Sequence, residues 1–131
     1  MEHDRITLDT HILIWYIHEE SNVRLSQRAL TAIMEAEENG RIYVPAVVLI
    51  EILSLLEKRR YPISFDDMLQ DIEDNEAYTI VPLTTEIIKV MRNLKYLELH
   101  DRAIVATAVM TDTDLVSIDA NISRRYNRVL R

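Results

Sequence analysis

Short apolar runs alternate with longer stretches of mixed polarity along the whole chain. These runs span only three or four residues and are apolar at most positions, which is typical of strands buried on both faces of a sheet. Polar residues, turn residues or a proline follow them closely. We predict strands over residues 6–8, 42–44, 79–81 and 115–118, and a short fifth strand at 129–130.

The stretches between these runs carry helical signals. Between residues 25 and 38 apolar residues recur every three or four positions, and Gly40 then supplies a stop signal. Pro45 suits the first position of a helix, because its missing N–H is not needed there. Ser64, followed three residues later by Asp67, resembles a capping box. We predict helices over residues 12–16, 25–38, 45–58, 64–74, 84–96 and 101–111.

Strands that alternate with helices predict a parallel sheet with helices on both faces. The chain has 131 residues, a length that fits one domain with a real core. It shows no internal repeat, low-complexity segment or linker. The predicted fold class is therefore a single α/β domain.

Aspartates fall at the ends of the predicted elements. Asp9 directly follows the first strand, Asp119 directly follows the fourth, and Asp101 begins the helix that leads into the fourth strand. Ligands of open parallel sheets bind in the crevice beyond the carboxyl ends of the strands, so we expect the three side chains to share that crevice. Each aspartate alone also has an ordinary explanation, as a turn residue or a helix cap. Their convergence favours a site.

Glu51 lies in a helical segment, residues 47–53, that is otherwise apolar. An isolated ionised carboxylate in such surroundings is costly unless it is paired or bound to a cation. The alternatives are that Glu51 occupies a solvent-facing stripe of the helix or pairs with a buried arginine. If it instead faces the crevice, it joins the three aspartates.

Four carboxylates in one crevice repel each other. Two unit charges about 4 Å apart repel by roughly 4 kcal/mol at an effective dielectric constant near 20. Either some of the groups are protonated, or a divalent cation neutralises them. Ligands that are all oxygen, in a chain without cysteine, favour Mg²⁺ or Mn²⁺ over Zn²⁺. Such ions suit phosphodiester hydrolysis, because they activate water and stabilise charge that builds on the phosphate.

The bulk composition adds limits to this hypothesis. The net charge of −7 argues by itself against a nucleic-acid partner, but acids gathered around a cation do not repel a phosphate. A single glycine excludes P-loop and dinucleotide-binding sites, and no Gly-x-Ser-x-Gly motif is present. The absence of cysteine, of a signal peptide and of a long apolar run predicts a cytoplasmic protein outside the membrane.

Four blocks of sequence carry the candidate acids. They read LDTHILIW at residues 8–15, VPAVVLIEI at 44–52, HDRAIVATA at 100–108 and LVSID at 115–119. In order and spacing, the blocks resemble the PIN-domain ribonucleases, specifically the VapC-like toxins of bacterial type II toxin–antitoxin systems. The resemblance covers essentially the whole chain, although the acidic segment at residues 61–78 has no specific match.

This resemblance implies a PIN-like, doubly wound parallel sheet of about five strands flanked by helices, in one PIN domain over residues 1–131. It implies a Mg²⁺- or Mn²⁺-dependent endoribonuclease that hydrolyses RNA phosphodiesters. Asp9 and Asp101 are then the central metal ligands, and Glu51 and Asp119 complete the catalytic and metal-binding site. It also implies a homodimer that a cognate VapB-like antitoxin silences.

Substrate contacts are expected from three further residues. By resemblance, the hydroxyl groups of Thr10 and Ser117 contact metal-bound water or phosphate. Arg102 is one of several basic residues that flank the crevice in sequence and are candidates to meet RNA phosphates; the alternative for each of them is an ordinary solvated charge. The basic run at residues 58–60 ends a predicted helix and is sufficiently explained by the helix dipole.

Two other functions are compatible with this architecture. One is a catalytically silent PIN-fold domain that only binds proteins and shows no metal-dependent thermal shift. The other is a phosphoacceptor signalling domain, which also places acids around Mg²⁺. That site needs a lysine after a late strand, where this chain has Asp119 followed by Ala120 and Asn121.

Overall fold

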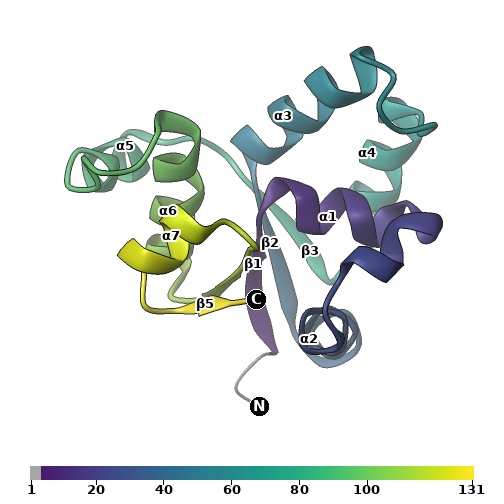
Figure 1. Cartoon of the computed structure of the whole chain (residues 1–131), viewed down its shortest axis with the longest axis horizontal. Helices are drawn as coiled ribbons and strands as arrows, with labels where there is room; N and C mark the ends of the chain where they lie inside the picture. Colours follow the sequence, from purple (N-terminus) through teal and green to yellow (C-terminus); the bar gives the residue numbers. More distant parts are fainter. Residues whose placement is uncertain (1–3) are drawn as a thin grey trace.

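Five parallel strands form the centre of the fold in a computed structural model that describes residues 4–131 (Figure 1). Their order across the sheet is β3-β2-β1-β4-β5, and every neighbouring pair is parallel. The strands are β1 (Arg5–Leu8), β2 (Arg41–Pro45), β3 (Tyr78–Val81), β4 (Asp114–Val116) and β5 (Val129–Leu130). The predicted parallel sheet of about five strands is confirmed.

Helices cover both faces of this sheet. In Figure 1, α1 to α4 lie on one side of the strands and α5 to α7 on the other. The helices are α1 (Thr10–Ile17), the 3₁₀ helix η1 (Glu19–Arg24), α2 (Gln27–Asn39), α3 (Ala46–Glu57), α4 (Phe65–Asp74), α5 (Thr85–Met91), α6 (Leu99–Thr111) and α7 (Ala120–Arg125). The fold is therefore a doubly wound α/β sheet, as predicted.

The strand order reverses at the boundary between β1 and β4. From β1 the chain adds β2 and β3 on one side, and it then returns to add β4 and β5 on the other. Leu8 pairs with Val116, and the Asp9 N–H donates to the Val116 carbonyl at 3.0 Å. The carboxyl ends of these two strands are thus fixed side by side. Ligand crevices of open parallel sheets form at this reversal point.

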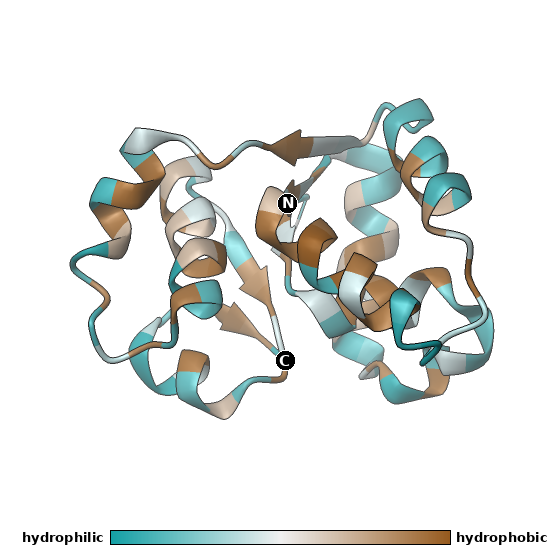
Figure 2. Ribbon diagram, turned by 90° about the horizontal axis from the view of Figure 1, so that it is seen from above, coloured by the Kyte–Doolittle hydropathy of each residue, from teal (hydrophilic) through white to brown (hydrophobic). Residues whose placement is uncertain are grey.

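The strands are apolar because both of their faces are buried. Ile6, Leu8, Ile42, Val44 and Leu115 are fully buried. Figure 2 shows the strands coloured mainly as hydrophobic where they run between the two helical layers. A strand covered on both faces cannot alternate apolar and polar residues, which explains the short apolar runs in the sequence.

Gly40 ends α2 at a place where a side chain does not fit. A Cβ atom added there comes within 1.5 Å of the Asp4 carbonyl oxygen. The backbone of residue 4 approaches so closely because the Arg41 N–H donates to that same carbonyl at 2.7 Å. The glycine that the sequence marks as a stop signal is therefore required by tertiary contact between α2 and β1.

Some predicted element boundaries are wrong. Pro45 is the last residue of β2, paired with Val81, rather than the first residue of the following helix. Helix α5 ends at Met91 instead of about residue 96. The reason is that Arg102 donates to the Leu97 and Lys95 carbonyls, at 2.7 and 3.0 Å, and so holds the segment before α6 in a non-helical path.

Helices η1 and α7 were not predicted, because both are short and lack a clear apolar period. None of the helices within residues 4–131 combines the length and the apolarity needed to cross a membrane.

Candidate active site

The four acids singled out from the sequence line one pocket. Asp9, Glu51, Asp101 and Asp119 surround a hollow of about 370 Å³, which we call the acidic pocket. It lies beyond the carboxyl ends of β1 and β4, at the point where the strand order reverses. Its other lining residues are Thr10, His11, Glu98 and Ile118. The structure therefore brings together four carboxylates that are far apart in the chain.

Asp9 is held in place by two short hydrogen bonds. It follows β1 and caps α1, where its Oδ1 accepts from the Thr10 N–H at 2.7 Å. Its Oδ2 accepts from the Ser117 hydroxyl at 2.6 Å. Ser117 is fully buried, and its Oγ also accepts from the Asp119 N–H at 3.0 Å. Ser117 thus ties Asp9 to the turn that carries Asp119.

Glu51 faces the same pocket from the half-buried side of α3. Its Oε1 accepts from the Thr10 hydroxyl at 2.5 Å, and its Oε2 lies 3.5 Å from His100 Nδ1. The Glu51 side chain is 30% exposed, so it is neither an ordinary solvent-facing residue nor deeply buried. A hydroxyl takes the place of the arginine partner that one reading of the sequence proposed.

Asp101 does not begin its helix. Glu98 caps α6, since its carboxylate accepts from the N–H groups of His100 and Asp101 at 3.2 and 3.4 Å. Asp101 therefore lies in the first helical turn, with its side chain on the pocket. Aspartate is a better cap than glutamate, which is why the sequence placed the helix start two residues too late. Sequence reasoning also missed Glu98 as a pocket residue.

Asp119 does not directly follow a strand. Strand β4 ends at Val116, and Asp119 caps α7, accepting from the Ile122 N–H at 3.0 Å. The explanation of an aspartate as a local cap thus holds for Asp9 and for Asp119. In both cases the cap orients a carboxylate that also lines the pocket, so the local role and the pocket role coexist.

Crowding of negative charge changes the protonation of the pocket. Burial and the carboxylates of Asp119, Asp9, Glu98 and Glu51 raise the pKa of Asp101 to about 6. Burial also raises the pKa of Asp9, against the lowering effect of hydrogen bonds from Ser117 and Thr10. These shifts mean that the carboxylates interact across the pocket, and that ionising all of them costs free energy.

The sequence model of the PIN domain family matches residues 6–127. The chain belongs to the PIN-domain family. Comparison with curated protein sequences finds no match.

Several solved structures share the fold of this PIN domain. VapBC2 from Rickettsia felis, bound to a promoter DNA fragment, has a TM-score of 0.72 and 16% identity, with 97% of each chain covered. A toxin–antitoxin complex from Klebsiella pneumoniae has a TM-score of 0.66 and 17% identity, with 96% of each covered. FitAcB from Neisseria gonorrhoeae has a TM-score of 0.68 and 15% identity, also with 96% of each covered. At such identities the similarity shows the fold alone.

The three residues expected to contact substrate have other partners in this PIN domain. The hydroxyls of Thr10 and Ser117 donate to Glu51 and Asp9, so each one orients a carboxylate. The Arg102 guanidinium donates to backbone carbonyls of the segment before α6 and does not line the acidic pocket. This geometry gives Arg102 a structural role and offers no support for a phosphate contact.

The donor chemistry of the pocket fits a hard divalent cation. Carboxylate oxygens are the ligands that Mg²⁺ and Mn²⁺ prefer, and the described residues that line the pocket include five acids but neither lysine nor arginine. Within residues 4–131, no three acidic, histidine or cysteine side chains already stand together as a metal-binding group. The residues fit such an ion by type, and coordination requires their side chains to draw closer.

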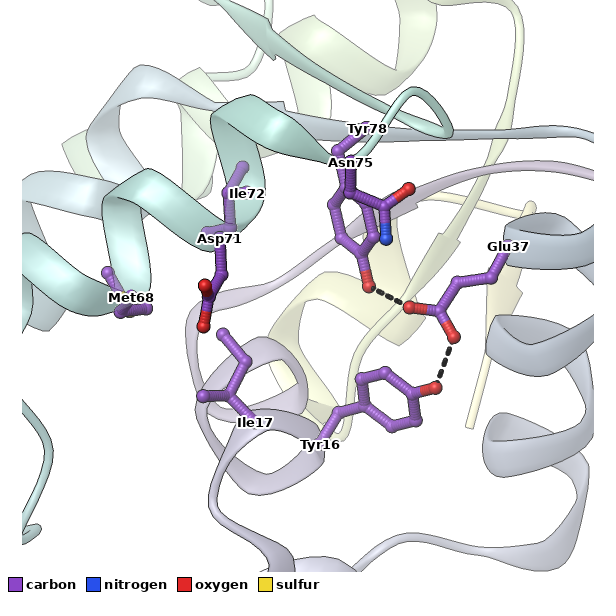
Figure 3. Close-up of a pocket in the computed structure, with 8 residues that line it drawn as sticks. All are labelled: Tyr16, Ile17, Glu37, Met68, Asp71, Ile72, Asn75 and Tyr78. Carbon is purple, nitrogen blue, oxygen red and sulfur yellow. Dashed lines mark hydrogen bonds between the residues drawn. The ribbon is translucent and has the colours of Figure 1, made fainter.

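A second pocket, of about 220 Å³, lies among α1, α2, α4 and β3 and is drawn in Figure 3. The Glu37 carboxylate points between two tyrosines and accepts hydrogen bonds from both of their hydroxyls. Tyr78 donates at 2.8 Å, and Tyr16 donates to the other oxygen. We call this the Glu37 pocket; its lining also includes Asp71 and the apolar side chains of Ile17, Met68 and Ile72.

Proposed function

We propose that this PIN domain is a Mg²⁺- or Mn²⁺-dependent endoribonuclease. The observation that carries the proposal is the acidic pocket, where four carboxylates from separate parts of the chain meet, and where burial and the neighbouring carboxylates raise the pKa of Asp101 to about 6. A divalent cation removes the mutual repulsion that otherwise opposes ionisation. Asp9 and Asp101 are proposed as the central ligands, completed by Glu51 and Asp119.

The chain's own residues orient this site. Ser117 holds Asp9 and the Asp119 turn together, and Thr10 holds Glu51 against the start of α1. A bound ion supplies Lewis acidity toward water and phosphate, so no side-chain nucleophile is needed. These hydrogen bonds already restrict the side chains of Asp9 and Glu51, so less conformational entropy is lost when the carboxylates draw together around an ion.

A cleavage assay with a ligand variant tests the proposal. Purified wild-type chain and Asp9→Asn are incubated with a panel of structured RNAs in Mg²⁺, in Mn²⁺ or in EDTA. We expect cleavage only by the wild type with a divalent ion, while circular dichroism shows that Asp9→Asn remains folded. Equal cleavage by both proteins contradicts the proposal. A wild type with no cleavage and no metal-dependent thermal shift favours the catalytically silent alternative.

We further propose that the enzyme is the VapC-like toxin of a toxin–antitoxin pair. The fold similarity to VapBC2, to the Klebsiella pneumoniae complex and to FitAcB supports this role. The prediction is a neighbouring open reading frame for a small DNA-binding, VapB-like protein that co-purifies with this chain. Expression of the chain alone is expected to arrest growth, and co-expression of the neighbour to relieve the arrest. Growth arrest by Asp9→Asn at equal protein levels contradicts a toxin that acts by cleavage.

On the basis of the resemblance to VapC-like toxins, we also propose that the chain forms a homodimer in solution. Light scattering on the purified chain tests it, and a mass near the 15.4 kDa of a single chain contradicts it.

A further inference from the structure

A second hollow adjoins the acidic pocket along α3. It measures about 390 Å³ and shares Thr10, His11 and Glu51 with the acidic pocket. The three common lining residues place the two hollows side by side, with Glu51 at the boundary between them. We call the second hollow the α3 groove. Its remaining lining residues are Ile50, Ser54, Leu55, Lys58 and His100.

The lining becomes less negative from the acidic pocket to the α3 groove. Asp9, Glu98, Asp101 and Asp119 belong to the acidic pocket alone. Among residues 4–131 that line the α3 groove, Glu51 is the one acid, and the Thr10 hydroxyl already donates to it. A polyanion whose reacting phosphate lies at the metal ligands therefore meets a more favourable potential if it continues along α3.

Lys58 stands at the far end of the groove, where α3 ends. The chain turns there through Arg59 with a left-handed φ of 56°, so that the N–H groups of Arg59 and Arg60 return to the Leu56 and Leu55 carbonyls at 2.9 and 3.2 Å. All three basic side chains of this turn are exposed. The helix dipole explains the position of these residues in the sequence, and Lys58 also lines the groove.

The groove also has an apolar surface. Ile50 is 60% exposed although it is large and aliphatic, and Leu55 is half-buried beside it. The exposed imidazole of His11 lies at the boundary with the acidic pocket, its ring centroid 5.6 Å from that of Trp15. Single-stranded nucleic acids are bound by such combinations of a cation for the backbone and flat or apolar side chains for the bases. The volume lies within the range of about 300–1,000 Å³ typical of small-ligand pockets.

We propose that the α3 groove is the subsite for the unpaired RNA nucleotide next to the cleaved bond. Lys58 binds the phosphate of that nucleotide, and Ile50 and Leu55 contact its base. This inference rests on the proposed ribonuclease function. It assigns a substrate role to Lys58, the first residue of the basic run at 58–60, for which the sequence offers only a helix-dipole explanation.

A matched pair of lysine variants tests the subsite. Lys58→Gln removes the proposed phosphate contact, and Lys89→Gln makes the same charge change on an exposed position of α5 that lines neither hollow. Cleavage of a single-stranded RNA is measured as kcat and KM between 0.1 and 1 M salt. One lost contact on single-stranded nucleic acid reduces the salt slope by about 0.7, which is about fivefold in affinity across this tenfold range. We expect Lys58→Gln to raise KM about fivefold at the lowest salt with kcat retained, and Lys89→Gln to change neither constant.

The outcomes separate the subsite from the proposed function. If Asp9→Asn abolishes cleavage while Lys58→Gln keeps the wild-type KM and salt slope, the subsite is wrong and the ribonuclease stands. If the wild type does not cleave, RNA binding is measured instead, by the fluorescence anisotropy of a labelled RNA in EDTA. The Kd and its salt slope are then compared between wild type, Lys58→Gln and Lys89→Gln. No RNA binding by the wild type overturns both proposals.

A second variant tests the apolar side of the α3 groove and asks whether the groove binds a protein instead of RNA. Ile50→Ala is expected to change the base preference next to the cleavage position without altering the salt slope. If Ile50→Ala instead leaves base preference unchanged and shifts the oligomeric state seen by light scattering, the groove is a protein interface and the RNA subsite is overturned.

Discussion

Two pockets of this PIN domain place carboxylates beside hydroxyl groups, with opposite electrostatic results. In the Glu37 pocket one carboxylate accepts from two tyrosines, and burial together with the Glu37 charge raises the pKa of both phenols (Figure 3). The tyrosines thus stay protonated and keep donating. In the acidic pocket the carboxylates face each other, and the raised pKa values belong to Asp9 and Asp101 themselves.

The difference shows how a structural carboxylate is distinguished from a candidate ligand. Each oxygen of Glu37 accepts a hydrogen bond from a tyrosine hydroxyl, so the fold itself supplies the hydrogen-bond donors that this carboxylate needs. In the acidic pocket both Asp9 oxygens also accept hydrogen bonds, from the Thr10 N–H and the Ser117 hydroxyl, but four further carboxylates stand around the same hollow and neither lysine nor arginine is among its described lining residues. A pocket that gathers several acids without a lysine or arginine is suited to bind a cation from solution.

The largest expected effect is the loss of cleavage in Asp101→Asn. If Asp101 is a metal ligand, the variant loses several kcal/mol of transition-state stabilisation, or about 10³-fold in kcat/KM. The same change removes a repelled charge, so the free energy of unfolding in EDTA is expected to rise. Single-turnover cleavage and urea denaturation measure the two effects. A kcat/KM of Asp101→Asn within tenfold of wild type contradicts the interpretation that the acidic pocket, unlike the Glu37 pocket, binds the catalytic cation.

Glu37→Ala is expected to lower the stability of the fold and to leave cleavage nearly unchanged. It leaves the Tyr16 and Tyr78 hydroxyls without their acceptor in a partly buried place, at a cost of about 2–3 kcal/mol in the free energy of unfolding. Glu37→Gln retains an acceptor oxygen and should cost about half as much. Cleavage by either variant should stay within about twofold of wild type at a temperature where both are folded. If either variant loses most of its cleavage activity while it is fully folded, the prediction is wrong and the Glu37 pocket takes part in catalysis.

Ser117→Ala is expected to produce an intermediate effect. Asp9 loses a donor and the Asp119 N–H loses its acceptor, so both carboxylates become less well oriented. Outer-shell partners of metal ligands typically contribute about 10–100-fold, and we expect a tenfold loss of kcat/KM with weaker Mg²⁺ dependence of cleavage. Ser117→Thr keeps a hydroxyl and serves as the control. Equal losses in both variants point to disturbed packing of a buried position rather than to orientation.

The smallest effect is a pH dependence of stability without metal. Because the pKa of Asp101 is raised to about 6 from its ordinary 3.8, the folded chain binds the proton more tightly than the unfolded chain. This group therefore adds stability as the pH falls from about 6 toward 4 and opposes folding above that window. In EDTA, Asp101→Asn should melt a few degrees above wild type at pH 7, and the gap should narrow at pH 5. A gap that does not change with pH contradicts the crowded-carboxylate interpretation.

Local signals in the sequence were sufficient for most of the architecture. Apolar runs predict the buried strands, and Ser64 indeed caps α4, where its Oγ accepts from the Asp67 N–H. The boundaries around Pro45 and before α6 were wrong because distant groups decide them. The pairing of β2 with β3 includes Pro45, and the Arg102 side chain holds the segment that precedes its own helix.

For the candidate site too, local sequence signals predict one part and contacts between distant residues decide the other. The positions of Asp9, Glu51, Asp101 and Asp119 relative to the predicted elements were enough to expect one crevice, because parallel strands bring their carboxyl ends to one edge of the sheet. The residues that orient these acids were not assigned that role. The bond between Ser117 and Asp9 spans 108 residues, and no local pattern encodes such a separation.

By itself the sequence determined which segments are buried strands and which acids lie at their ends, since burial pattern and chain order are local properties. Only the tertiary structure decided which charges have partners. It gave Glu37 two tyrosine donors, placed neither lysine nor arginine among the described residues that line the acidic pocket, and placed Lys58 in the wall of the adjoining groove. Coulomb and hydrogen-bond energies depend on distances through space, and folding sets those distances between residues that are remote in the chain.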